Sequence, residues 1–197
     1  MPCPSLPEEL RLGPVTTAIA ADAGLTPKQL RGTAWRHLFR DVYVHVDAPD
    51  TVAMRAAAAA LVLPPDAVIG YTTAAWLHGA DVRTTPLGPV EVILQRGGQL
   101  RRAGLRATSA LLDRGDVTVV GGIPVTSPVR TAFDLARTRR GVEAVVGVDA
   151  MLNRGGCDLD ELTSYVAAHP AWRGVVSARR ALEQVDAGSQ SPMETRM

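Results

Sequence analysis

The chain has 197 residues, of which 46% are hydrophobic and 21% charged, a composition typical of globular proteins that excludes an intrinsically disordered chain. This length predicts one domain, or one domain with a small additional module. The 21 basic and 20 acidic residues give a formal net charge of +1. That balance argues against a protein that coats nucleic acid through its overall charge, but it is compatible with a local basic patch.

The cysteine content and the apolar runs exclude further classes. Cys3 and Cys157 are too few for a structural zinc site, and they imply no disulfide framework. The longest uninterrupted apolar run, residues 56–63, is far shorter than the roughly 20 residues that a membrane span needs. The first residues have neither the basic nor the apolar segment of a signal peptide. We therefore expect a cytoplasmic protein.

The first 50 residues predict two short helices followed by a strand. Gly24 is suited to end the first helix, because glycine accepts a left-handed turn. Thr26, Pro27 and Gln29 have the pattern of an N-cap, a first-turn proline and a capping box, which predicts the start of the second helix. The helices are expected at 15–23 and from 26 to 35 or 37, and the strand at 42–46.

The remaining chain predicts a mixture of helices and short strands. Paired glycines mark the turns between them. Helices are expected at 52–63, 72–78, 128–138, 142–153, 159–168 and 172–185, and strands at 90–95, 105–109, 117–120 and 123–125. The fold class is thus α+β: an N-terminal winged helix-turn-helix (1–48), a mixed α/β domain (51–186) and a polar tail (187–197).

The two N-terminal helices meet the requirements of a helix-turn-helix. A small residue, Ala20, stands where the helices touch, and Gly24 follows four positions later. Apolar residues at helical spacing are expected to hold the pair together, namely Ile19, Leu25, Leu30 and Ala34.

Basic residues are concentrated around the second helix. Lys28 is the only lysine of the chain, and residues 26–40 contain four positive charges and no acidic residue. Lys28, Arg31 and Trp35 are expected on the exposed face of this helix, which would enter the major groove of DNA. Arg36 and Arg40 flank the following strand, the wing, within reach of phosphates. The candidate DNA-binding residues are Thr26, Lys28, Gln29, Arg31, Trp35, Arg36 and Arg40.

Two other interpretations stay open. The helix pair is also compatible with an ordinary bundle whose four charges form a solvated face. A protein-interaction module would instead use Trp76, Trp172 and the alanine-rich helix as a docking face. Further basic runs, among them Arg96, Arg101, Arg102 and Arg106, are compatible with a solvated surface or with an extended DNA-facing surface.

No pattern in the sequence predicts catalysis, a metal site or a cofactor. The four histidines are scattered, and no nucleotide-binding or nucleophile motif is present. Asp158 and Glu161 are best explained as a helix cap rather than as metal ligands. The pair of Arg130 and Asp134 is expected to be structural. We therefore expect a protein that is not an enzyme.

These motifs resemble a known family. Residues 24–30 (Gly-Leu-Thr-Pro-Lys-Gln-Leu) and 38–44 (Leu-Phe-Arg-Asp-Val-Tyr-Val) are similar to the N-terminal winged helix of AbiEi-type antitoxins, and residues 71–79 and 122–136 extend the resemblance. The family usually has a glycine where this chain has Asp41, so we expect a positive φ angle there. Together the matches span about residues 14–185.

The resemblance implies a function. AbiEi-type antitoxins belong to type IV (abortive-infection) toxin–antitoxin systems. The resemblance therefore implies a transcriptional regulator that binds its own operator region in double-stranded DNA. It also implies a nucleotidyltransferase-type toxin as functional partner, without a stable complex.

A second resemblance leaves an alternative open. Residues 191–194 (Ser-Pro-Met-Glu) resemble the start of a very-short-patch-repair-like endonuclease domain. Only three residues follow, so the catalytic core of such a nuclease is not in this sequence. The alternative is a non-catalytic, truncated front half of a nuclease-fused DNA-binding protein.

Overall fold

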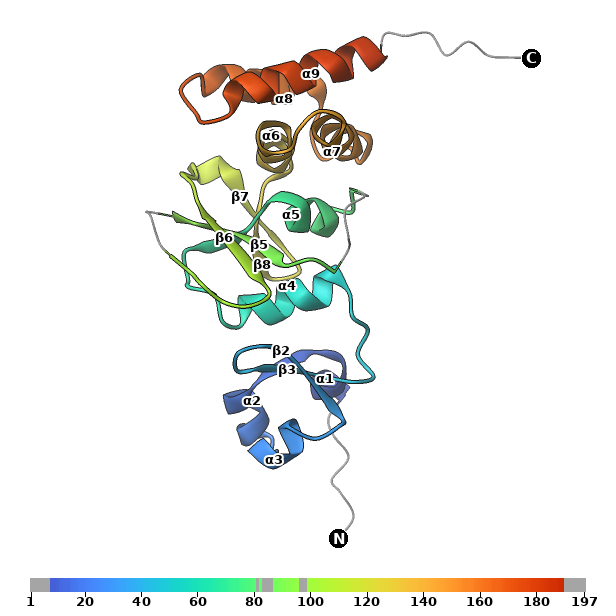
Figure 1. Ribbon diagram of the computed structural model, residues 1–197, viewed down its shortest axis with the longest axis vertical. Coiled ribbons are helices and arrows are strands. Elements are labelled where there is room, and N and C mark those ends of the chain that lie inside the picture. Colours follow the sequence, from blue (N-terminus) through green and yellow to red (C-terminus); the bar gives the residue numbers. More distant parts are fainter. Residues whose placement is uncertain (1–7, 81, 83–86, 96–98, 190–197) are drawn as a thin grey trace, which may run out of the picture. The chain divides into compact units, whose positions relative to one another are not determined.

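Figure 1 shows the computed structural model of the chain, which describes residues 8–80, 82, 87–95 and 99–189. The fold is α+β, as the sequence predicts. The chain forms two compact units, which we call the first and the second unit. The first contains Met1–Ile69, Thr85–Leu111 and Gly121–Pro124, and the second contains Gly70–Thr84, Leu112–Val120 and Val125–Met197.

The chain passes back and forth between the two units, so each unit contains elements from separate stretches of the sequence. The first unit holds α1 (Glu8–Leu12), β1 (Pro14–Thr16), α2 (Thr17–Asp22), α3 (Pro27–Leu30), β2 (Trp35–Phe39), β3 (Val42–His45), α4 (Val52–Ala60), β4 (Ala67–Ile69), β5 (Val90–Leu94) and β6 (Leu105–Ser109). The second holds α5 (Tyr71–Leu77), the 3₁₀ helix η2 (Arg114–Asp116), β7 (Val117–Val120), α6 (Pro128–Thr138), α7 (Val142–Asn153), α8 (Leu159–Ala168) and α9 (Val175–Ser189). Strand β8 (Ile123–Thr126) begins in the first unit and ends in the second.

The N-terminal part of the first unit has the topology of a winged helix. Its elements follow one another as helix, strand, two helices and a strand hairpin. The strands form an antiparallel sheet in the order β1-β3-β2, with Val15 opposite Tyr43 and Trp35 opposite His45. Helix α4 contacts both β1 and β2, so the small sheet lies between α4 and the helices α2 and α3 (Figure 1).

A second sheet follows, with five strands in the order β6-β5-β4-β8-β7. Strand β4 runs antiparallel to β5, and β5 runs parallel to β6. All five residues of β5 are buried, as expected of a strand covered on both faces.

The second unit is organised around α6. This helix contacts α5, α7, α8 and α9, and seven of its residues are buried. Ser127 caps its N-terminus by accepting a hydrogen bond from the backbone amide of Arg130. Trp76 and Trp172, which the alternative interpretation placed on a docking face, are partly buried and pack against the core around Phe133.

Local sequence signals predicted the helices of the second half and most of the strands correctly. Helices α6, α7 and α8 have the predicted bounds, and the wing strand β3 and strands β5 to β8 were also predicted. Helix α1, strand β1 and strand β4 were missed. The first unit extends past the expected boundary at residues 49–50, because it includes α4, β4, β5 and β6. The resemblance of residues 191–194 to a nuclease lies outside the described residues.

The prediction for the second N-terminal helix is wrong in its length. Helix α3 has only four residues, and Trp35, Arg36 and His37 belong to strand β2 instead. The aromatic residues of this segment fit a strand, and its backbone pairs with β3. Long-range pairing therefore prevails over continuation of the helix.

In the part of the chain that the structure describes, every helix is too short or too polar to cross a membrane.

Candidate nucleic-acid interface

Local hydrogen bonds define the turn between α2 and α3. The Thr16 hydroxyl caps α2 by accepting a hydrogen bond from the backbone amide of Ile19 at 3.1 Å. Gly24 takes a φ angle of 79°, and the backbone amide of Leu25 donates to the carbonyl of Ala20 at 2.8 Å. Glycine adopts this left-handed conformation without steric cost, so the prediction that Gly24 ends the first helix is confirmed.

The start of α3 is fixed by the predicted capping box. The Thr26 hydroxyl accepts from the backbone amide of Gln29, and the Gln29 side-chain oxygen accepts from the backbone amide of Thr26 at 2.7 Å. Both side chains are exposed, but these acceptor atoms are already used to satisfy amides of the helix end. The side-chain amide nitrogen of Gln29 has no hydrogen-bond acceptor among the described residues.

A small core holds the helices against the sheet. Ala20, Leu30 and Trp35 are buried in it together with Val15, and Leu25 packs against it. Ala20 and Leu30 therefore have the predicted role. Ile19 and Ala34 are exposed, contrary to expectation. Ala34 is not on the helix at all, because α3 ends at Leu30.

Trp35 was expected on the exposed face of the second helix, and this expectation is wrong. Its side chain is 9% exposed and lies with its ring edge-on to His45 at a centroid distance of 5.4 Å. Trp35 is thus a core residue of the winged helix, and we do not carry it into the interface.

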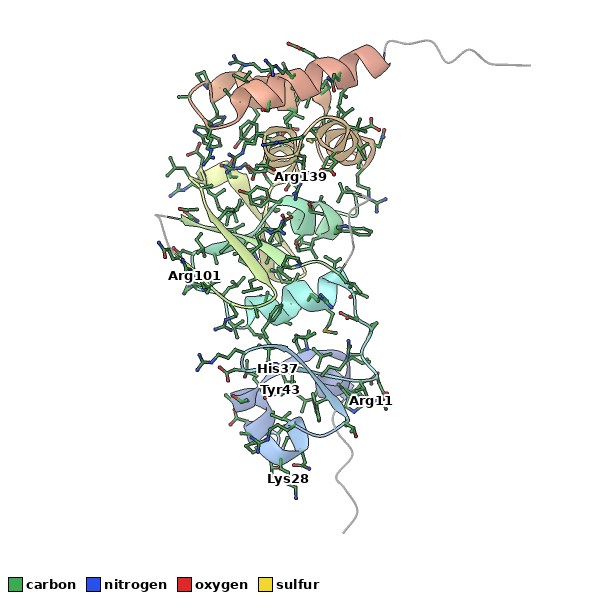
Figure 2. The ribbon with its side chains drawn as sticks, viewed as in Figure 1. Arg11, Lys28, His37, Tyr43, Arg101 and Arg139 are labelled. Carbon is green, nitrogen blue, oxygen red and sulfur yellow. The ribbon has the colours of Figure 1, made fainter. Side chains whose placement is uncertain are left out.

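Lys28 and Arg31 form the exposed cationic face of α3. Both side chains are exposed, and neither makes an ion pair with the described residues. Figure 2 shows Lys28 at the free end of α3, directed away from the small sheet. A cationic face of this kind can contact phosphates and base edges.

The tip of the wing carries Arg40 and Asp41. Asp41 takes a φ angle of 67°, so the expected positive φ is confirmed, and its carbonyl accepts a hydrogen bond from the amide of Thr17 at 3.2 Å. The Arg40 side chain is 86% exposed and meets the Asp41 carboxylate only at 3.9 Å. Such an exposed pair restrains Arg40 weakly.

Arg36 is used within the fold. Its Nη2 donates to the carbonyl of Ala48 at 2.7 Å, and its Nη1 lies 3.4 Å from the carboxylate of Asp50. Asp50 also receives two hydrogen bonds from Arg55, at 2.8 and 2.9 Å, which lower the pKa of its carboxyl group. Arg36 therefore joins the hairpin to the start of α4, and it is a poor candidate for phosphate contact.

The second unit contains a buried ionic network around Arg130, which sequence patterns revealed only in part. Arg130 donates to Asp134 at 2.9 Å and to Asp116 at 2.6 Å, and all three side chains are at most 2% exposed. Tyr165 donates to the other oxygen of Asp116 at 2.6 Å. Burial and the bond to Asp116 raise the pKa of Tyr165, so its hydroxyl stays a donor. The Arg130–Asp134 pair is structural, as expected.

The acidic residues at the start of α8, considered above as possible metal ligands, have a structural role. Asp158 caps α8 by accepting from the amide of Glu161 at 2.7 Å, which confirms the capping interpretation. Among the described residues, no group of three or more His, Cys, Asp or Glu side chains is placed to hold a metal ion.

Residues 66–184 match the family described as the AbiEi antitoxin C-terminal domain. This chain belongs to that family. The match covers β4 to most of α9 and begins after the winged helix, so the AbiEi assignment rests on the part of the chain that follows it.

Three further proteins are similar to this AbiEi family member. The uncharacterized proteins Rv2248 and MT2308 of two Mycobacterium tuberculosis strains are each 34% identical over 134 residues. These matches cover 66% of this chain and 46% of each relative, so the chain spans about half the length of these curated relatives. The crystal structure of the RV2827C protein from M. tuberculosis shares the fold, with a TM-score of 0.57 and 14% identity, over 90% of this chain and 73% of that one.

Proposed function

We propose that this chain is a DNA-binding transcriptional regulator that serves as the antitoxin of a type IV toxin–antitoxin system. The observation that carries the DNA-binding half is the exposed cationic face of α3, Lys28 and Arg31, at the tip of a winged helix. Membership of the AbiEi antitoxin family supports the antitoxin half. This role requires no catalysis, metal or cofactor in this chain.

The expected docking geometry assigns different tasks to the exposed residues. Helix α3 enters the major groove, where Arg31 contacts base edges and Lys28 contacts phosphates or bases near the start of the helix. Arg40 at the wing tip contacts the phosphate backbone. Thr26 and Gln29 support α3 through the capping box, and the free amide of Gln29 is a further donor toward DNA.

For the second half of the role, we assign neutralisation to residues 66–184, which match the antitoxin domain. The functional partner is a nucleotidyltransferase-type toxin, which the antitoxin counteracts without forming a stable complex with it.

DNA binding is tested by a salt titration with a duplex from the region upstream of the chain's own gene. Each phosphate neutralised adds about −0.9 to the slope of log affinity against log salt, so Lys28, Arg31 and Arg40 together give a slope of about −3. Arg31→Ala should reduce discrimination between this duplex and an unrelated one, while Arg40→Ala should weaken both similarly.

The control for these variants is Arg180→Ala, which removes the same charge from an exposed position of α9. It should leave affinity and slope unchanged. Absence of any salt-dependent affinity in the wild-type protein would refute the DNA-binding proposal.

A further inference from the structure

Residues 99–104, which lead into β6, approach the tip of the wing. Arg102 Nη1 donates a hydrogen bond to the carbonyl oxygen of Arg40 at 3.3 Å. Gly104 has a φ angle of 81°, and a Cβ atom on it would lie 2.7 Å from Cε1 of Phe39. No side chain fits at Gly104 without displacing the ring, so the close approach depends on this glycine.

Backbone hydrogen bonds hold this segment in place. The amide of Leu105 donates to the carbonyl of Arg102 at 3.1 Å, and the amide of Val90 donates to the carbonyl of Gly104 at 2.9 Å. Residues 102–105 thus form a turn anchored to the sheet, and Arg102 is held beside the wing.

Basic residues lie near the point where Arg102 meets the wing tip. The side chains of Arg40 and Arg101 are exposed, that of Arg102 is half-buried, and Arg101 makes no ion pair with the described residues. The acidic groups paired nearby are Asp41, 3.9 Å from Arg40, and Glu91, which is engaged by Arg106 at 3.5 Å. Among the ion pairs of the described residues, Asp41 pairs with Arg40 and none involves Arg101 or Arg102.

The hydrogen bond to the Arg40 carbonyl holds Arg102 beside the wing tip, and Arg101 is its neighbour in the chain, so the exposed cations here attract a polyanion. The carbonyl of Arg40 explains the position of Arg102, but no described contact explains Arg101. Figure 2 shows Lys28 at one end of the first unit and Arg101 at the other, with His37 and Tyr43 of the hairpin between them. Exposed cations thus lie at both ends of the first unit, and not at α3 alone.

We propose that Arg101 and Arg102 form a second phosphate-contacting site beside the wing tip, so that one DNA duplex contacts the first unit from α3 to residues 101 and 102. The inference rests on the proposed DNA-binding function and deepens it. The contacts are to the backbone, because the site lies outside the helix that reads the major groove. They add affinity without sequence preference and raise the expected salt slope from about −3 to between −4 and −5.

The test is a salt titration with a duplex of about 30 base pairs of unrelated sequence, because phosphate contacts do not depend on sequence. Arg101→Ala should weaken binding about fivefold at 0.15 M salt and make the slope shallower by about one unit. Arg102→Ala should do the same, and the double variant should lose about two units. Arg101 makes no described contact with the protein, so its variant separates DNA binding from folding, and a thermal melt checks Arg102→Ala.

The matched control is Arg180→Ala, with the same change in charge, which should bind as the wild type does. If Arg101→Ala retains wild-type affinity and slope while replacement of Lys28 and Arg31 abolishes binding, the second site is refuted and the proposed function stands. If the wild-type protein binds neither duplex, both proposals fail together.

Discussion

At the scale of single residues, the second unit contains a buried positive charge, that of Arg130, which must be compensated by its neighbours. Burial opposes the charged form, but Asp134, Tyr165 and Asp116 raise the pKa of the guanidinium above its ordinary value. Its aliphatic and aromatic surroundings include Trp172, whose ring centroid lies 4.7 Å from the guanidinium carbon. A buried charge of this kind is tolerated only while its partners remain in place.

Asp116→Asn should therefore destabilise the protein by about 3 kcal/mol. The amide keeps the shape but removes one of the charges that compensate Arg130, and its NH₂ group replaces one of the two oxygens that accept hydrogen bonds from Arg130 and Tyr165. Urea unfolding followed by circular dichroism measures the change. Asp160→Asn, on the exposed side of α8, is the control and should change stability by less than about 0.5 kcal/mol. A loss no greater than the control's would contradict the structural role of Asp116.

Residue-level predictions succeeded where the relevant neighbour is close in sequence. The i,i+4 spacing revealed the pair of Arg130 and Asp134, and the missing glycine in the wing pointed to a positive φ at Asp41. Asp116 and Tyr165 escaped notice, because they approach Arg130 from other elements and no local spacing records that approach.

At the scale of elements, helix starts were more predictable than helix ends. An N-cap such as Thr26 or Asp158 acts on amides within three residues, so its effect is visible in the sequence. The end of α3 depends instead on the pairing of β2 with β3, which a helical reading of residues 31–37 overlooked. Strand β4 was missed because three residues carry too little periodicity.

The start of α4 gives a pH-dependent prediction. The Arg55 hydrogen bonds lower the pKa of Asp50 below its ordinary value of 3.8. The carboxylate therefore stabilises the fold above its unfolded pKa, and this stabilisation is lost as pH falls through the folded pKa. Asp50→Asn should be less stable than the wild type near neutral pH, with the difference shrinking as pH falls below about 4.

Urea midpoints of both proteins between about pH 6 and pH 2.5 provide the measurement. Other carboxyl groups titrate in both proteins, so only the difference between them reports on Asp50. A difference that is constant across this range would show that Asp50 does not contribute as an ion-pair partner of Arg55.

At the scale of the whole molecule, a net charge of +1 conceals an uneven distribution. The cations of α3 and of the wing tip are exposed, whereas other arginines are held in ion pairs within the fold, such as Arg55 with Asp50 and Arg130 with Asp134. Further exposed arginines lie on α9, among them Arg179 and Arg180. A chain of this kind is expected to bind DNA through one local surface rather than by overall charge.

This distribution predicts that the two proposed activities are separable. A double variant with Lys28→Ala and Arg31→Ala should lose repression of a reporter driven by the upstream region. It should still restore growth of cells expressing a nucleotidyltransferase-type toxin encoded next to the chain's gene, because the changes lie outside residues 66–184. Colony counts and reporter activity measure the two effects, and loss of both in a folded protein would contradict the separation.

The sequence by itself determined the α+β class, the helix starts, the turn at Gly24, most of the strands and the resemblance to AbiEi antitoxins, because these depend on local spacing and short motifs. Only the tertiary structure decided that Trp35 is buried, that Arg36 pairs with Asp50 and that Arg102 meets Arg40. Each of these results from contacts between segments that are distant in the chain or from strand pairing that overrides local helix propensity. In the basic run at residues 101–106, which the sequence left open, the structure brings Arg102 to the wing tip and pairs Arg106 with Glu91.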